Sequence, residues 1–108
     1  MKRSVYALTE LRDRLAAAND LYDEFLRVEA MSAGLYALPA GATDPQTPHN
    51  EDEIYYVISG RASIDIDGEV TAVEPGAVIF VGKHVEHRFI DIAQDLEVLV
   101  LFAPAETT

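Results

Sequence analysis

The stretch TPHNEDEIYYVISG, residues 47–60, places His49 and Glu53 directly before a run of alternating β-forming residues. A second stretch, PGAVIFVGKHVEHRF, residues 75–89, holds the other two histidines of the chain, His84 and His87. Neutral imidazole and carboxylate are the usual ligand mixture of a catalytic divalent metal. Together the two stretches predict a metal site.

A turn between His49 and Glu53 is needed if both bind one ion. In a single strand the two residues would lie about 13 Å apart, at roughly 3.3 Å per residue, whereas each ligand must reach within about 2.0–2.2 Å of the metal. The β-branched and aromatic residues after Glu53 argue against a helix. We therefore expect a turn at residues 50–52, with His49 ending one strand and Glu53 beginning the next. His87, from another strand, completes a three-ligand face.

Most of the chain after residue 24 has the pattern of short strands separated by turns, which indicates an antiparallel sandwich or barrel. Within residues 25–38, Gly34 is expected to separate two extended segments, and the prolines between residues 39 and 48 exclude regular helix. Gly60-Arg61 and Asp67-Gly68 are expected to be hairpin turns. The strands expected after residue 50 are 54–59, 62–67, 69–73, 78–81, 87–92 and 96–103.

One short helix is predicted near the amino terminus. Leu8, Leu11 and Leu15 recur at helical spacing, and Thr9 is suited to be the N-cap of a helix over residues 9–18. We divide the chain into an amino-terminal segment, residues 1–22, and a β-barrel domain, residues 23–108. The apolar stripe of the helix is expected to pack on this domain.

The last predicted strand is apolar on both faces. Between residues 96 and 102 only Glu97 is polar, so both faces of this strand should be buried. One face belongs to the core, and the other needs a cover. The amino-terminal helix or a second copy in a symmetric homodimer could provide it, and we expect the dimer.

Two gapped motifs in this sequence resemble those of the cupins, a family of small β-barrels. The first runs through Gly41, Thr47, His49, Glu53 and Gly60, and the second through Gly76, Gly82, His84, His87 and Asp91. The spacing is that of the family in both motifs, and the resemblance covers roughly residues 34 to 104. It implies an all-β fold, an antiparallel jelly-roll barrel, here with a short helix before it.

The resemblance also implies a set of site residues. Thr47 stands where the family usually has its first metal-binding histidine, which leaves His49, Glu53 and His87 as ligands and open positions on the ion. The metal could be Fe, Mn, Ni, Cu or Zn. Glu51 is expected to be a base or hydrogen-bond acceptor beside the site, although either Glu51 or Gln46 could instead replace the missing ligand. The candidate pocket residues are Thr47, Tyr55 and Phe89, with Tyr55 and Val57 facing inward and Tyr56 outward.

Three functions are compatible with these residues. The leading one is a metal-dependent, dioxygenase-like enzyme that acts on a small molecule at an open site. Sugar-phosphate isomerases and epimerases of the family need a cationic clamp, and this chain has only eight Lys plus Arg, of which Arg27 and Arg61 are the candidates. The third is a barrel that binds or senses a small molecule without catalysis. His84 is expected to be a turn residue.

Composition restricts the partners. The sequence carries a formal net charge of -11 and no cysteine. Nucleic acids and anionic membranes both attract clusters of Lys and Arg, so neither is an expected partner. A chain without cysteine forms no disulfide, and its first 20 residues lack the apolar run of an export signal. We therefore expect a cytoplasmic protein whose ligand is a small molecule.

Overall fold

Two long strands that pair with each other form the centre of the protein. They are β3 and β6 of a computed structural model that describes residues 4–107. The elements in chain order are α1 (Leu8–Ala18), β1 (Tyr22–Val28), β2 (Met31–Leu38), β3 (Asp52–Ile66), β4 (Glu69–Val73), β5 (Val78–Val81) and β6 (His87–Ala103). All strand pairs are antiparallel.

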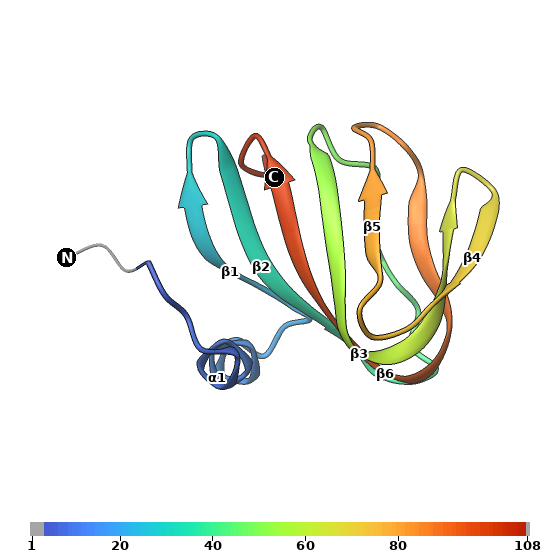
Figure 1. Ribbon diagram of the computed structural model, residues 1–108, viewed down its shortest axis with the longest axis horizontal. Helices are drawn as coiled ribbons and strands as arrows, with labels where there is room; N and C mark the ends of the chain where they lie inside the picture. The colour runs from blue at the N-terminus through green and yellow to red at the C-terminus, as the bar shows by residue number, and fades with distance from the viewer. Residues whose placement is uncertain (1–3, 108) are drawn as a thin grey trace.

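The strands follow the order β1-β2-β6-β3-β4, and β5 pairs with the first half of β3. The first half of β3 pairs with the second half of β6, with Asp52 opposite Ala103. The second half of β3 pairs with the first half of β6, with Ile66 opposite His87. Figure 1 shows both strands curving at the bottom of the view, so that their halves rise on opposite sides of the interior. The predicted jelly-roll barrel with a short amino-terminal helix is confirmed.

The predicted hairpin turn at Gly60-Arg61 is wrong, because β3 continues through both residues. The pairing with β6 shifts register between Val57 and Ser63, which bends the strand without reversing it. Gly60 has a φ of +92°, and a Cβ there would lie 2.2 Å from the carbonyl oxygen of Asp95 on β6. The predicted gap between strands 87–92 and 96–103 is wrong for the same reason, since β6 passes through the bend alongside β3.

The predicted break at Gly34 is also wrong. The turn between β1 and β2 lies at residues 29–30, and Gly34 is inside β2. A Cβ on Gly34 would lie 2.2 Å from the Tyr22 ring, so the glycine makes room for an aromatic side chain and does not interrupt the strand. The predicted turn at Asp67-Gly68 is confirmed: both residues have positive φ, 51° and 88°, and the turn joins β3 to β4.

Helix α1 packs on the outer face of β2. It begins at Leu8, with Ala7 at the N-cap position and no side-chain cap, so the expectation that Thr9 is the N-cap is wrong. The helix starts earlier because Leu8 packs against the small cluster that Leu11 and Leu15 form with Leu35 of β2. No helix within residues 4–107 is long and apolar enough to cross a membrane. The domain division at residue 22 stays a prediction, and residues 1–3 and 108 lie outside the described range.

The two faces of β3 differ in burial as the alternation predicts. Tyr55 and Val57 are fully buried in the barrel, whereas Tyr56 is 42% exposed. On the outer face, the cluster under α1 includes Leu35 of β2, Phe25 of β1 and Ile58 of β3. An apolar strip remains farther along this face and consists of Ile54, Tyr56, Val78, Phe80, Leu99 and Leu101. The helix therefore does not provide the whole cover, and the homodimer stays a prediction.

Replacing Gly60 by alanine should destabilise the barrel much more than replacing Gly68. Both glycines have positive φ, but only Gly60 would bring its new methyl group against backbone atoms of β6. We expect Gly68→Ala to lower the free energy of unfolding by about 1–2 kcal/mol through backbone strain, and Gly60→Ala by roughly 1–3 kcal/mol more through overpacking. Urea denaturation of both variants measures the difference. Equal losses would mean that the bend does not depend on this close approach.

Phe80→Glu should weaken self-association if a second copy covers the apolar strip. A charge at this 61% exposed position would be buried in the dimer without a partner. Sedimentation velocity at micromolar concentration should show a dimer for the wild type and a monomer for the variant. Val70→Glu is the matched control, because Val70 is similarly exposed, at 54%, but lies on β4 outside the strip. A monomeric wild type contradicts the prediction.

Candidate metal centre

His49 lies in an irregular segment between β2 and β3. The expectation that it ends a strand is wrong, because no residue between Leu38 and Asp52 is in a strand, and Pro45 and Pro48 lack the backbone N–H that regular pairing needs. The segment is held by the turn before β6: the His84 N–H donates to the His49 carbonyl oxygen at 2.7 Å. His84 has a φ of 65°, as its predicted role in a turn requires.

The bend of the central strand pair brings Glu53 and His87 together. Glu53 lies near the start of β3 and His87 at the start of β6, and these two starts belong to opposite halves of the pair. Both residues are buried and point into the interior. The distance from His87 Nε2 to Glu53 Oε1 is 3.1 Å.

With His49 the two residues form a cluster of ligand size. One atom from each of the three side chains lies within 4.8 Å of the others. Ligand atoms about 2.1 Å from one ion are separated by at most about 4.2 Å, so small side-chain rotations would complete the coordination. The structure therefore brings the three predicted residues together, while metal binding stays a prediction.

Three polar atoms of this cluster, on Glu53 and His87, lack partners outside it among the described residues. While His87 is neutral, both carboxylate oxygens of Glu53 and Nε2 of His87 are buried without a hydrogen-bond partner within the described residues, because the 3.1 Å contact between Nε2 and Oε1 then joins two acceptors. The other ring nitrogen of His87, Nδ1, lies 2.9 Å from the Val85 carbonyl oxygen and donates to it, which leaves a lone pair on Nε2. Buried unpaired groups of this kind are costly. A divalent cation would satisfy all three atoms, so the residues fit such an ion.

A proton on Nε2 of His87 would compete with a metal ion for the lone pair of that nitrogen. Burial by itself lowers the pKa of His87, but the Glu53 carboxylate, the Val85 carbonyl and the charge of Asp44 raise it by more, so the net shift is upward. A metal must displace the proton, and metal affinity should therefore rise with pH.

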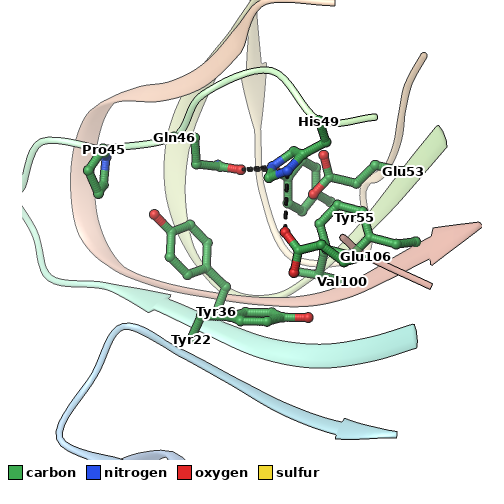
Figure 2. Close-up of a pocket in the computed structure, with 10 residues that line it drawn as sticks. Tyr22, Tyr36, Pro45, Gln46, His49, Glu53, Tyr55, Val100 and Glu106 are labelled. Carbon is green, nitrogen blue, oxygen red and sulfur yellow. Dashed lines mark hydrogen bonds and ion pairs between the residues drawn. The ribbon is translucent and has the colours of Figure 1, made fainter. Parts of the chain in front are cut away.

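A cavity of about 160 Å³ opens beside His49 and Glu53 (Figure 2). Its walls are mainly apolar or aromatic, with a few polar groups at one side. They comprise Tyr22, Tyr36, Pro45, Gln46, His49, Glu53, Tyr55, Val100, Phe102 and Glu106. Among residues 4–107 the Tyr22 hydroxyl is buried without a hydrogen-bond partner, and burial is the main cause that raises its pKa.

Asp44 organises one wall of the cavity and was not foreseen from the sequence. Its buried carboxylate accepts hydrogen bonds from the Tyr36 hydroxyl at 2.5 Å, the Gln46 amide at 2.7 Å and the Phe89 N–H at 2.8 Å. Gln46 in turn accepts the Tyr55 hydroxyl at 2.6 Å. Asp44 is outside the motif positions and lies in a turn-like stretch, so nothing in its spacing indicated burial.

The other predicted site residues are dispersed. Tyr55 lines the cavity, whereas Thr47 is exposed in a separate hollow beside His87. Phe89 is buried behind Tyr55, with ring centroids 5.0 Å apart, and does not line the cavity. Glu51 is buried and turned toward the carboxyl terminus, where its Oε2 accepts the Thr107 hydroxyl at 2.8 Å.

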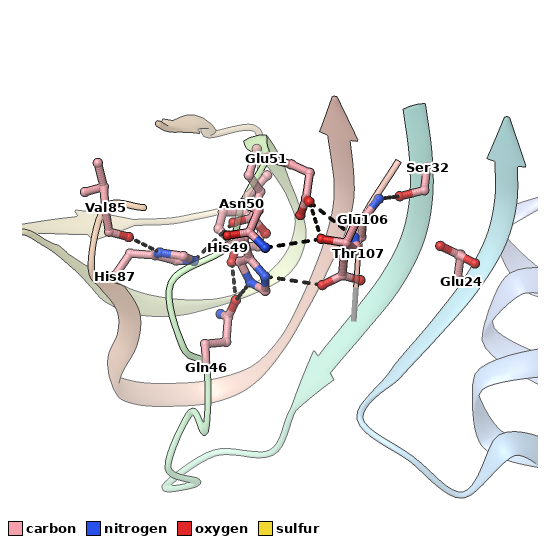
Figure 3. Close-up of polar contacts among 12 residues, drawn as sticks. Glu24, Ser32, Gln46, His49, Asn50, Glu51, Val85, His87, Glu106 and Thr107 are labelled. Carbon is pink, nitrogen blue, oxygen red and sulfur yellow. Dashed lines mark hydrogen bonds and ion pairs between the residues drawn. The ribbon is translucent and has the colours of Figure 1, made fainter. Parts of the chain in front are cut away.

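Glu106 is a site neighbour that the sequence analysis missed. Its Oε2 lies 3.3 Å from His49 Nδ1 (Figure 3). Burial, followed by the charges of Glu51, Glu53 and Glu24, raises the pKa of Glu106, and Arg27 opposes this shift. Glu106 is far from both histidine windows in the sequence, and no motif position refers to it.

Comparison with known proteins identifies a matching family model and a relative that is similar over almost the whole chain. The family model described as a cupin domain matches residues 34–103. An uncharacterized protein of Streptomyces coelicolor is 49% identical over 102 residues, which covers 94% of this chain and 97% of that protein.

Solved structures share the fold. KdgF from a Halomonas species superposes with a TM-score of 0.70 at 24% identity, covering 77% of this chain and 76% of that one. The DMSP lyase DddQ from Ruegeria pomeroyi superposes with a TM-score of 0.66 at 25% identity, and the match covers 70% of this chain but 39% of the lyase.

Glu53→Gln should stabilise the metal-free protein while removing its response to metal. At a pH above the raised pKa of His87, where its imidazole is neutral, the change removes a buried charge for which the described residues offer no hydrogen-bond donor, which should raise the free energy of unfolding by about 1–3 kcal/mol. Thermal unfolding with and without Zn(II) measures both effects. Loss of stability in the metal-free variant would mean that the carboxylate is satisfied within the protein.

Proposed function

The chain belongs to the cupin family, and we propose that it is a metal-dependent enzyme acting on a small molecule bound beside His49, Glu53 and His87. The observation that carries this proposal is the set of buried lone pairs on Glu53 and His87, next to a cavity, for which the described part of the chain offers no hydrogen-bond donor. A barrel interior that had lost its metal function would gain stability by replacing these groups with apolar ones.

Three protein ligands leave coordination positions for a substrate. Bound there, a divalent ion such as Fe, Mn, Ni, Cu or Zn would polarise a chelating substrate and, with a redox-active metal, support dioxygen-dependent cleavage. The chain itself holds the ligands in place: Val85 orients His87, and the turn at His84 anchors the segment that carries His49.

The cavity limits the substrate to a small molecule. Its volume of about 160 Å³ is below the range of about 300–1,000 Å³ typical of drug-sized ligands. Val100 and Phe102 supply apolar contact, and Gln46, His49 and Glu106 place polar groups on the same cavity for the oxygen atoms of a substrate. A compact oxygen-bearing molecule with an apolar part fits these walls.

Phosphorylated sugars fit the site poorly. No lysine or arginine of the described residues lines the cavity. Arg61 is paired with Glu74, and Arg27 with Glu24. Since phosphate recognition usually needs a cationic clamp, we rank a sugar-phosphate isomerase or epimerase below an oxygen-dependent enzyme.

Gln46 is better placed than Glu51 to replace the ligand missing at Thr47. The Gln46 Oε1 atom lies 3.4 Å from His49 Nε2 and lines the same cavity. One Glu51 oxygen holds Thr107, and Glu51 does not line the cavity. We therefore assign Glu51 no proton transfer in the proposed reaction.

Elemental mass spectrometry of the untagged protein tests the proposal. We expect close to one divalent ion per chain, and loss of that ion in the His49→Ala/His87→Ala double variant, whose circular dichroism should remain that of a folded barrel. The identity of the retained metal then selects the reaction to assay.

His84→Asn is the matched control, because it removes an exposed imidazole outside the cluster while asparagine tolerates the positive φ of the turn that holds the His49 segment. Full metal content in the double variant would overturn the ligand assignment. No metal in the wild type, even after anaerobic loading with Fe(II), Mn(II) and Zn(II), would favour a barrel that binds a small molecule without metal or turnover.

A further inference from the structure

The last described residues form a strap across the mouth of the barrel. We define the C-terminal strap as residues 105–107. Its backbone is tied to β1 and β2: the Ala105 N–H lies 3.5 Å from the Glu29 carbonyl oxygen, the Glu106 N–H donates to Ser32 Oγ at 2.9 Å, and Arg27 donates to the Glu106 carbonyl oxygen at 2.5 Å. None of these bonds uses the Glu106 side chain.

The far end of the strap is tied to the segment that carries His49. The N–H and the hydroxyl of Thr107 both donate to Glu51 Oε2, at 3.2 and 2.8 Å, and Asn50 donates to Thr107 Oγ1 at 3.3 Å. Glu51 is 2% exposed, so its carboxylate is a built anchor for the strap and not a solvated acid. Figure 3 shows the strap reaching from Ser32 to Asn50 and Glu51.

Anchored on both sides, the strap directs one carboxylate inward. Glu106 lines the cavity, and its Oε2 lies 3.3 Å from Nδ1 of His49, with both side chains only 18% exposed. Glu106 does not belong to the group of atoms within 4.8 Å of one another that His49, Glu53 and His87 form. It therefore contacts His49 without reaching the common centre of the three ligands.

We propose that Glu106 is a positioning residue of the metal site, which accepts the Nδ1–H of His49 so that Nε2 faces the ion. The proposal rests on the metal-binding function proposed above. A carboxylate behind a ligating imidazole determines its tautomer, holds the ring and makes the ligand nitrogen more basic. His87 has the Val85 carbonyl in the equivalent place, and without Glu106 the less buried His49 would lack such a support. In this arrangement His49 Nε2 and Gln46 Oε1, 3.4 Å apart, can both face the same cation.

Titration of the metal-free protein with Co(II), followed by its visible absorption, tests this role. We expect Glu106→Ala to weaken Co(II) binding by about 10–100-fold, as is typical when a partner behind a metal ligand is removed. Glu106→Gln keeps an acceptor oxygen and all backbone bonds of the strap, so it should bind with intermediate affinity. Glu29→Gln is the control, because it removes the same charge from an exposed position beside the strap.

The nitrogen that binds metal can be observed directly. Long-range ¹H–¹⁵N spectra of the Zn(II)-loaded protein should show His49 bound through Nε2 with a proton on Nδ1, and in Glu106→Gln that Nδ1 proton should exchange faster with water. A variant that is merely less stable would still bind Zn(II) through the same nitrogen of His49. Thermal unfolding of each metal-free variant measures any loss of stability.

The outcomes separate this inference from the proposed function. Both are supported if the wild type binds Co(II) and the affinity for Co(II) falls from the wild type to Glu106→Gln and further to Glu106→Ala. Tight binding by the wild type with unchanged affinity in Glu106→Ala, or Zn(II) on Nδ1 of His49, overturns the positioning role and leaves the metal site intact. A wild type that binds neither Co(II) nor Zn(II) overturns both.

Discussion

The bent pairing of β3 with β6 is the constraint on which the rest of the structure depends. Each strand crosses the barrel from one side to the other, and the bend lies where Gly60 approaches the β6 backbone without a Cβ. The starts of the two strands thereby meet inside the barrel, and these starts carry Glu53 and His87. If β3 and β6 had each been divided into two shorter strands at the bend, nothing in their pairing would have brought Glu53 and His87 together.

The barrel interior contains polar groups that lower the stability of the folded protein. Tyr55, Val57 and Val98 are completely buried around it, and their burial drives folding. The same interior contains the Glu53 carboxylate and Nε2 of His87, which contact each other but find no hydrogen-bond donor among residues 4–107. Such groups are usually found where function requires them. The compact core is what allows the protein to tolerate them.

The environment of the site comes largely from residues that do not belong to the histidine windows. Asp44 organises Tyr36 and Gln46 along one wall, Tyr22 lies over Gly34, and Glu106 approaches His49 from the carboxyl end. The family model ends at residue 103, before Glu106. Since the barrel is shared by proteins of many functions, the choice of ligand depends on the side chains that line the cavity and on the strap.

The sequence by itself determined the all-β class, the turn at Asp67-Gly68, the inward side of β3 and the three residues of the candidate metal cluster. These depend on local rules: alternation along a strand, the positive φ of a tight turn, and the chemistry of imidazole and carboxylate. It did not determine that β3 and β6 are continuous, that Gly34 accommodates Tyr22, or that Glu51 holds Thr107 while Glu106 faces His49. Only the tertiary structure decided these points, because each depends on which distant backbone or side chain lies alongside, and no local pattern of residues records that neighbour.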